Sequence, residues 1–253
     1  LAAASGLIHA NKARLGKTLW TEQREGENVK IRGVWDGEEE ARLIGDDIEA
    51  EQHKGRPLSD MAVLVRASYQ MRAFEERFNT LGVPYRVVGG PRFYEREETR
   101  DALAYLKLIR SAEDDLSFER IVNKPRRGLG DKALTTLHTL ARANGVTLIA
   151  ASRLALETDD LHASARKSLA AFINSLDRWS RDARDMPPAD IAELVLEESG
   201  YIDMWKTSKS AQADGKIDNL KELVQAASEF ETLEAYLDHV ALVSELSESA
   251  EGG

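Results

Sequence analysis

The spacing of hydrophobic residues changes near residue 92. Before that point, short apolar runs alternate with segments whose apolar residues recur at helical intervals. The runs at 29–35, 61–67 and 85–90 are short and apolar, as in strands of a buried parallel sheet. The segments 38–52 and 69–82 have the pattern of amphipathic helices. Alternating strands and helices predict a partial α/β parallel sheet with right-handed crossovers.

After residue 92 nearly every segment has the period of an amphipathic helix. From Leu161 to Trp179, and again from Ile217 to Ala227, apolar residues recur at intervals of three and four. The chain is therefore expected to have a mixed fold, with a partial α/β parallel-sheet half followed by an all-α helical domain. The expected boundaries are 1–92, 93–245 and a short tail at 246–253.

Composition limits the possible classes of protein. The net charge of −10 argues against a nucleic-acid-binding surface over the whole molecule, but screening over about 10 Å leaves room for a local basic patch. The chain has no cysteine, which excludes disulfides and a cysteine nucleophile and fits the cytoplasm. No apolar run approaches the roughly 20 residues of a membrane span. The chain has no initiator methionine and ends on "ESAEGG", so it is expected to be part of a longer protein.

Several motifs of enzymes and metal sites are missing. The "GKT" at Gly16–Thr18 would be a phosphate loop only with glycine at position 11, which is Asn11. The acidic run at 36–51 is best explained as the solvated face of a helix. The five histidines lack the spacing of metal ligands. We therefore expect no catalytic residue, no cofactor and no metal site within this chain.

The stretch "NKPRRGLGDKALTTL" at 123–137 places a glycine-containing turn before a helical segment. Between Arg120 and Lys132 there are five cations and one anion. The free N–H groups and dipole at a helix start attract phosphate, and glycines allow it to approach the backbone. The turn could bind the DNA backbone without reading sequence, or it could be a plain helix connection with incidental charge.

A second dense motif, "GGPRFYEREETRDALAYLKLI" at 89–109, lies where the two halves of the chain meet. It could be a linker followed by an amphipathic helix. However, Phe93, Tyr94, Glu95 and Arg96 are an unusually dense set of aromatic and charged residues for a linker.

These motifs and others closely resemble, in order and spacing, the UvrD/PcrA/Rep-like superfamily 1 DNA helicases. The resemblance rests on "AVLVRASYQMRAFEE", "GVPYRVVGGPRFYEREETRDALAYLKLI", "FERIVNKPRRGLGDKAL", "SGYIDMW", "KIDNLKELV" and "LEAYLDHVAL". It covers essentially the whole chain.

The resemblance implies an architecture and an activity. In such helicases, two RecA-like motor domains hold ATP and Mg²⁺ between them and step 3′→5′ along single-stranded DNA. The second motor domain, 2A, is interrupted by a helical insertion, 2B, which contacts the duplex. Residues 1–92 match the first half of 2A and 93–245 match 2B. The Walker motifs would lie elsewhere, so this chain alone is expected to be inactive. Its expected partners are DNA, both single strand and duplex junction, and the remaining helicase domains.

The resemblance also implies roles for single residues. Arg66, Gln70 and Arg72 match a block near the single-strand path and motor cleft, although Val65 and Ser68 differ from the family pattern there. The hinge would be formed by Gly89, Gly90, Phe93, Glu95 and Arg96. The duplex contact would be formed by Lys124, Arg126, Arg127, Gly128, Leu129, Gly130 and Lys132.

Two other interpretations remain open from the sequence. The chain could be a stand-alone, non-enzymatic DNA-binding adaptor built on the glycine turn, although an adaptor has no need of half a motor domain. It could also be the helicase arm of an AddA-like helicase–nuclease. A nuclease would need a further domain with a carboxylate and lysine cluster, which this chain does not contain.

Overall fold

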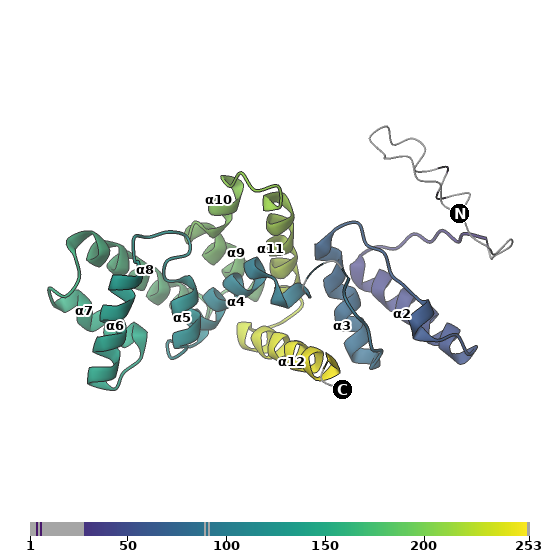
Figure 1. Ribbon diagram of the computed structural model, residues 1–253, viewed down its shortest axis with the longest axis horizontal. Helices are drawn as coiled ribbons and strands as arrows, with labels where there is room; N and C mark the ends of the chain where they lie inside the picture. The colour runs from purple at the N-terminus through teal and green to yellow at the C-terminus, as the bar shows by residue number, and fades with distance from the viewer. Residues whose placement is uncertain (1–3, 5, 7–27, 89, 91, 252–253) are drawn as a thin grey trace.

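The computed structural model describes residues 4, 6, 28–88, 90 and 92–251, and within them the chain folds into helices joined by short connections (Figure 1). The "GKT" at Gly16–Thr18 lies outside the described residues. The α-helices are α2 (Gly37–His53), α3 (Met71–Leu81), α4 (Glu97–Arg110), α5 (Asp115–Ile121), α6 (Asp131–Asn144), α7 (Leu148–Glu157), α8 (Ala163–Asp182), α9 (Pro188–Glu198), α10 (Tyr201–Lys206), α11 (Ala213–Ala227) and α12 (Leu233–Glu251). The 3₁₀ turns are η1 (Leu58–Asp60), η2 (Ser68–Gln70) and η3 (Phe93–Glu95).

Helices α2 and α3 confirm the helices predicted before residue 92. The Asp36 side chain caps α2 by accepting the N–H of Glu39 at 2.8 Å. Gly82 ends α3 in the left-handed conformation, with φ of 65°. The two helices pack on a small hydrophobic cluster of Ala41, Ala73, Phe74 and Phe78.

The predicted parallel sheet is wrong. Among the described residues the structure contains no strand, and the runs 29–35, 61–67 and 85–88 have neither helical nor strand pairing. Several of their apolar side chains face outward: Ile31 is 93% exposed, Trp35 95% and Leu64 94%. Val65 and Tyr85 instead pack against the small cluster. An alternating or apolar run predicts an extended backbone, but a strand also needs a neighbour whose N–H and C=O groups pair with its own. These runs have no such neighbour among the described residues.

The helical character predicted after residue 92 is confirmed, and one large hydrophobic cluster runs through this part of the molecule. Helix α4 lies in the middle and packs against α5, α8, α9, α11 and α12 (Figure 1). Tyr105 on α4 is fully buried and meets Phe172 and Trp179 edge-on, with ring centroids 6.5 and 6.2 Å apart. Edge-to-face contacts of this kind stabilise a core beyond the area they bury.

The helices of the large cluster are arranged around α4. In Figure 1, α5 to α8 occupy one end of the molecule, and α2 and α3 lie at the other, with α12 near the middle. The connection between α5 and α6 is attached to the large cluster through Leu129, which belongs to it. The last helix, α12, ends at Glu251 and so includes residues 246–251 of the expected tail.

Candidate nucleic-acid interface

The connection 122–130 between α5 and α6 is an ordered hairpin, which we call the GLG hairpin. The Asn123 Oδ1 atom accepts the N–H of Arg127 at 2.8 Å and that of Leu129 at 3.3 Å. Gly128 has φ of +75°, a conformation that favours glycine. Leu129, between the two glycines, is 1% exposed and belongs to the large cluster. The turn is therefore pinned at its centre by a buried leucine and an asparagine.

Arg127 points into the protein. Its Nη1 atom donates to the carbonyl of Ile121 at 2.9 Å, and its Nη2 atom donates to the Tyr105 hydroxyl at 2.6 Å. The guanidinium also lies over the Phe172 ring, 4.5 Å from its centroid. Most of its donors are thus occupied by the chain itself. Arg127 holds the GLG hairpin onto α4 and α8 in this structure.

Lys124 and Arg120 are paired with a buried carboxylate of α4. Asp101 is fully buried; its Oδ1 lies 2.7 Å from Arg120 Nε and its Oδ2 lies 2.8 Å from Lys124 Nζ. Lys124 also pairs with Glu97 at 2.7 Å. Burial opposes the charge on Lys124, but the hydrogen bonds to Asp101 and Glu97 outweigh it and raise its pKa. Hydrogen bonds from Lys124 and Lys216 lower the pKa of Glu97 to about 2.

Of the five cations counted in the sequence, Arg126 and Lys132 are the exposed ones. Both flank the start of α6. No side chain caps this helix start; the N–H groups of Ala133 and Leu134 bond to the Gly130 carbonyl at 2.9 and 3.2 Å. The N–H groups of Asp131 and Lys132 precede them in the first turn. The space where a Cβ of Gly130 would lie is open, so an anion can approach the backbone here.

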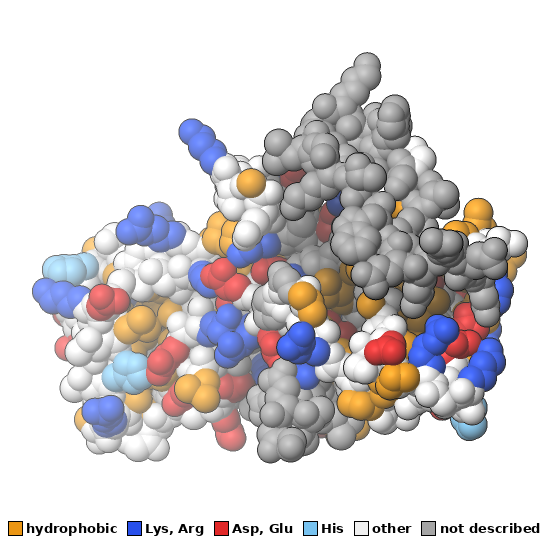
Figure 2. All heavy atoms as spheres, turned by 45° about the vertical axis from the view of Figure 1, so that its right-hand side comes forward, with side chains coloured by type: hydrophobic (Ala, Val, Ile, Leu, Met, Phe, Trp, Pro, Cys, Tyr) orange, Lys and Arg blue, Asp and Glu red, His pale blue; other side chains and the backbone are white. Residues whose placement is uncertain are grey.

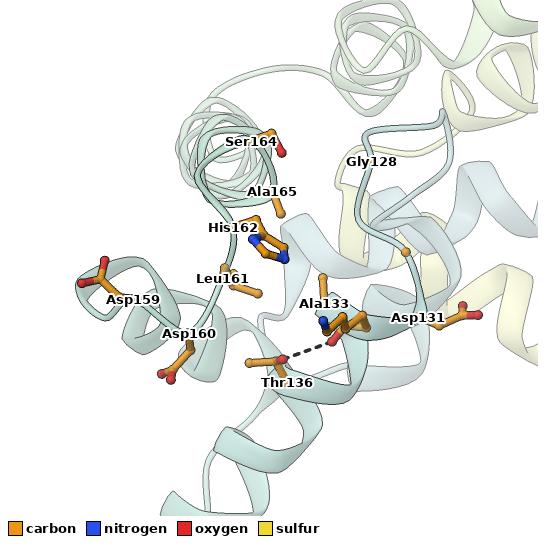
Figure 3. Close-up of a pocket in the computed structure, with 12 residues that line it drawn as sticks. Gly128, Asp131, Ala133, Thr136, Asp159, Asp160, Leu161, His162, Ser164 and Ala165 are labelled. Atoms are coloured by element: carbon orange, nitrogen blue, oxygen red, sulfur yellow. Dashed lines mark hydrogen bonds between the residues drawn. The ribbon is translucent and has the colours of Figure 1, made fainter.

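The GLG hairpin faces the start of α8 across an open pocket of about 530 Å³ (Figure 3). Figure 3 shows His162 and Ala165 on the α8 side and Ala133 and Thr136 on the α6 side. Asp159 and Asp160, just before α8, also line the pocket, so acidic as well as basic side chains border it. No side-chain hydrogen bond caps α8. Two uncapped helix starts therefore border one pocket, which Lys132 also lines.

The charge elsewhere on the molecule is mixed. Figure 2 shows basic and acidic side chains interspersed on the face it presents, without a continuous basic surface among the described residues of that face. This agrees with the net charge of −10. The two exposed cations of the GLG hairpin are thus not part of a larger basic surface on the face that Figure 2 shows.

The residues predicted near the motor cleft lie on and before α3. Arg66 is exposed, and the Gln70 side chain accepts the N–H groups of Arg66 and Ala67, both at 3.0 Å. Gln70 therefore shapes the turn that leads into α3. Arg72 is buried among carboxylates.

The residues predicted to form the hinge lie at the start of the helical domain. Phe93 is fully buried, and its N–H donates to the Glu75 carboxylate at 3.3 Å. Glu95 is exposed, and its Oε2 atom accepts the N–H of Arg92 at 3.4 Å. Arg96 Nη2 contacts the sulfur of Met71 at 3.5 Å. Gly90 is exposed, and Gly89 lies outside the described residues.

Sequence reasoning missed the residues that hold the GLG hairpin from behind. Asp101 and Tyr105 are one helical turn apart on α4, and both contact the hairpin or its cations. A single acid on the buried face of a helix is a signal that could have been read, because a buried carboxylate requires a cationic or hydrogen-bonding partner. Asn123, directly before the basic residues, had no such signal.

No helix among the described residues is long and apolar enough to cross a membrane. In the same part of the chain, no group of three or more histidine, aspartate or glutamate side chains is placed to hold a metal ion.

Comparison with known proteins gives consistent matches. The family model described as "UvrD-like helicase C-terminal domain" matches residues 1–251. A "Probable DNA helicase II homolog" of Rickettsia felis is 37% identical over 97% of this chain, which spans 38% of that protein. "DNA helicase II" of Escherichia coli is 37% identical over 96% of this chain, and "ATP-dependent DNA helicase UvrD1" of Mycobacterium tuberculosis is 35% identical over 100% of it. The chain spans 35% and 36% of those two relatives.

Proposed function

Because the chain belongs to the family of UvrD-like helicase C-terminal domains, we propose that it is part of an ATP-dependent DNA helicase that moves 3′→5′ in the cytoplasm. In this proposal residues 93–245 contact the duplex ahead of the motor, and residues 1–92 contribute to the second motor domain. The observation that carries the proposal is the exposed edge of the GLG hairpin, where the exposed Arg126 precedes the uncapped start of α6 and the exposed Lys132 lies in its first turn.

The chemistry of this edge suits the phosphate backbone. Exposed arginine and lysine side chains attract phosphate, and N–H groups at a helix start donate to its oxygens. The buried Leu129 and the Asn123 hydrogen bonds hold the turn in one shape, so little conformational entropy is lost on binding. Contacts to phosphate carry no sequence information, and binding through them would therefore depend on salt more than on sequence.

We propose different roles for the seven predicted contact residues. Arg126 and Lys132 meet the phosphates, with Gly128 and Gly130 allowing close approach. Leu129 anchors the turn. Lys124 and Arg127 act from behind it, because their charged groups are already bonded within the protein.

ATP and Mg²⁺ would serve the whole helicase. The phosphate-loop pattern, whose lysine and hydroxyl hold the nucleotide phosphates and Mg²⁺, is absent from this sequence. We therefore propose that other parts of the helicase hold the nucleotide and that this chain alone hydrolyses no ATP. Purified chain that retains DNA-stimulated ATP hydrolysis through repeated purification would contradict this.

The duplex contact can be tested by measuring binding of the full-length protein to blunt duplex DNA at several salt concentrations. Arg126→Ala and Lys132→Ala should each reduce the slope of log affinity against log salt by about one unit. Lys124→Ala should leave the slope nearly unchanged, because its charge is neutralised internally. Arg142→Ala is the matched control, since Arg142 is exposed on α6 but at the opposite end of the helix. If the first two variants behave like Arg142→Ala, the GLG hairpin is only a connection.

A further inference from the structure

The junction between the two hydrophobic clusters is polar. The residues of the small cluster and those packed against it lie between 41 and 85, whereas those of the large cluster lie between 93 and 243. Among the described residues, neither cluster includes a member from the other stretch. What joins α2 and α3 to the helical domain is therefore mainly hydrogen bonds and ion pairs, together with the chain connection.

Arg72 is at the centre of this junction. Its side chain is only 4% exposed, and its guanidinium contacts four carboxylates from four places in the chain. Glu38 of α2 and Glu76 of α3 lie 2.9 and 3.0 Å away on its own side. Glu222 of α11 lies 2.6 Å away and Glu229, after α11, lies 2.9 Å away on the other side.

The charges around Arg72 do not balance. Four carboxylates surround one guanidinium, so the group carries excess negative charge. His239 of α12 lies 3.7 Å from Glu76, and the Tyr94 hydroxyl donates to Glu76 at 2.7 Å; neither replaces the guanidinium at the other three carboxylates. Glu38 and Glu229 are half-exposed, so like charges this close repel one another and salt can still weaken that repulsion.

We propose that Arg72 is an electrostatic lock that holds the α2–α3 unit against the helical domain. With the guanidinium present, glutamates from both sides of the junction share one cation. Without it, Glu38 and Glu76 would face Glu222 and Glu229 across the junction, and their repulsion would drive the two parts away from this arrangement. Arg72 is thus a positioning residue for the whole helical domain, and through it for the GLG hairpin.

The following contacts at the junction cannot neutralise the glutamates as Arg72 does. Ser68 Oγ donates to Asn219 Oδ1 at 2.9 Å across the junction, and Asn219 is held within the helical domain by donating from Nδ2 to Glu98 at 2.6 Å. The N–H of Phe93 donates to Glu75 at 3.3 Å. These bonds align the two parts, but none of them brings a positive charge to the glutamates around Arg72.

The lock can be tested by measuring a distance across the junction in the full-length protein. Spin labels on Ala50→Cys in α2 and Ala143→Cys in α6 are suitable in a background without other cysteines, because both positions are exposed and this chain has no native cysteine. In Arg72→Gln the distance distribution should broaden and its maximum should shift by several ångströms. Raising salt from about 0.1 M to about 1 M shortens the Debye length from about 10 to about 3 Å and should move the variant back toward the wild-type distribution.

Two further variants separate charge from packing. Arg77→Gln is the matched control: Arg77 is also on α3, but it pairs with Asp46 of α2 on its own side of the junction, 3.1 Å away, and should leave the distance unchanged. Adding Glu222→Gln and Glu229→Gln to Arg72→Gln should restore the wild-type distance at low salt. If Arg72→Gln alone does not fold, this triple variant decides: a folded protein with the wild-type distance supports the lock, and an unfolded one overturns it. An Arg72→Gln distribution equal to that of Arg77→Gln also overturns it.

Discussion

The α2–α3 unit and the helical domain are both built from amphipathic helices, but they differ in what they bury. The small cluster has four buried hydrophobic residues, each 1–7% exposed. The large cluster includes several fully buried aromatic side chains, among them Tyr105, Phe118 and Trp179. The helical domain thus has a hydrophobic core of its own, whereas the α2–α3 unit depends on polar contacts with its neighbour.

The exposed apolar runs also distinguish the α2–α3 unit from the helical domain. A helix satisfies its backbone hydrogen bonds within itself, so α4 to α12 form wherever their apolar faces can meet. An extended run satisfies them only through a partner strand. The runs at 29–35 and 61–67 lie in the α2–α3 unit, and several of their large side chains, such as Ile31, Trp35 and Leu64, are exposed. The two regions therefore differ more in core size and in backbone hydrogen bonding than in sequence composition.

The largest difference in stability between the two regions is expected when a central side chain of each hydrophobic cluster is removed. Trp179→Ala takes away a 1% exposed indole from the large cluster and should lower the free energy of unfolding by about 3–5 kcal/mol. Phe78→Ala in the small cluster should cost less, because fewer neighbours lose contact. Hydrogen exchange followed by mass spectrometry should show faster exchange across 93–243 for Trp179→Ala, but only within 28–88 for Phe78→Ala. If both variants made exchange faster over the same residues, the two regions would unfold as one unit.

The next effect concerns pH and the junction between the regions. Burial raises the pKa of Glu75 to about 7, and the hydrogen bond from the Phe93 N–H only partly opposes it. Because the folded-state pKa is the higher one, stability from this group is complete below about pH 4.5 and is lost as the pH rises through 7.

Glu75→Gln removes this titration and keeps an acceptor for the Phe93 N–H. The variant should match the wild type near pH 4 and exceed its stability at pH 8 by on the order of 2 kcal/mol. Urea unfolding at a series of pH values measures this difference. Two curves that stay parallel from pH 4 to pH 8 would contradict the prediction.

A smaller effect should separate the two glycines of the GLG hairpin. Gly128→Ser places a side chain at φ of +75° and should cost about 1–2 kcal/mol. Gly130→Ser should be nearly neutral, because Gly130 has φ of −80°, its Cβ direction is open, and serine is a favoured helix N-cap. Thermal unfolding midpoints compare the two. A larger loss for Gly130→Ser would show that the strain lies at the other glycine.

The smallest effect is expected in the exposed runs of the α2–α3 unit. Ile31→Thr changes a side chain that is 93% exposed and should alter the stability of this chain by no more than about 0.5 kcal/mol. The same change at Ile121, which is fully buried on α5, is the matched comparison and should be clearly destabilising. Equal effects of the two substitutions would mean that Ile31 is buried in solution.

Much of the helical domain could be predicted from the sequence. The period of apolar residues identified the segments around α8 and α11, and Gly82 marked the end of α3. The turn with Gly128 and Gly130 was found as a turn between two helices. These features depend on neighbours within one or two helical turns, which a sequence displays directly.

The prediction of a sheet failed because strand pairing depends on segments distant in the chain. The runs at 29–35 and 61–67 have the composition of strands, but composition does not say whether a partner is present. The direction of each cation near the GLG hairpin was equally hidden. Lys124 and Arg127 look like Arg126 in a list of charges, but they are turned inward by Asp101 and Tyr105.

The sequence by itself determined the helices, their order and the basic turn, because helical periodicity and turn residues act locally. Tertiary structure alone decided three further features. It buried Leu129 and turned Arg127 inward behind the turn, and it left Arg126 and Lys132 exposed at its edge. It left the strand-like runs of the α2–α3 unit unpaired. It also gathered Glu38, Glu76, Glu222 and Glu229 around Arg72 from positions up to 191 residues apart, because opposite charges in a partly buried site attract whatever their separation along the chain.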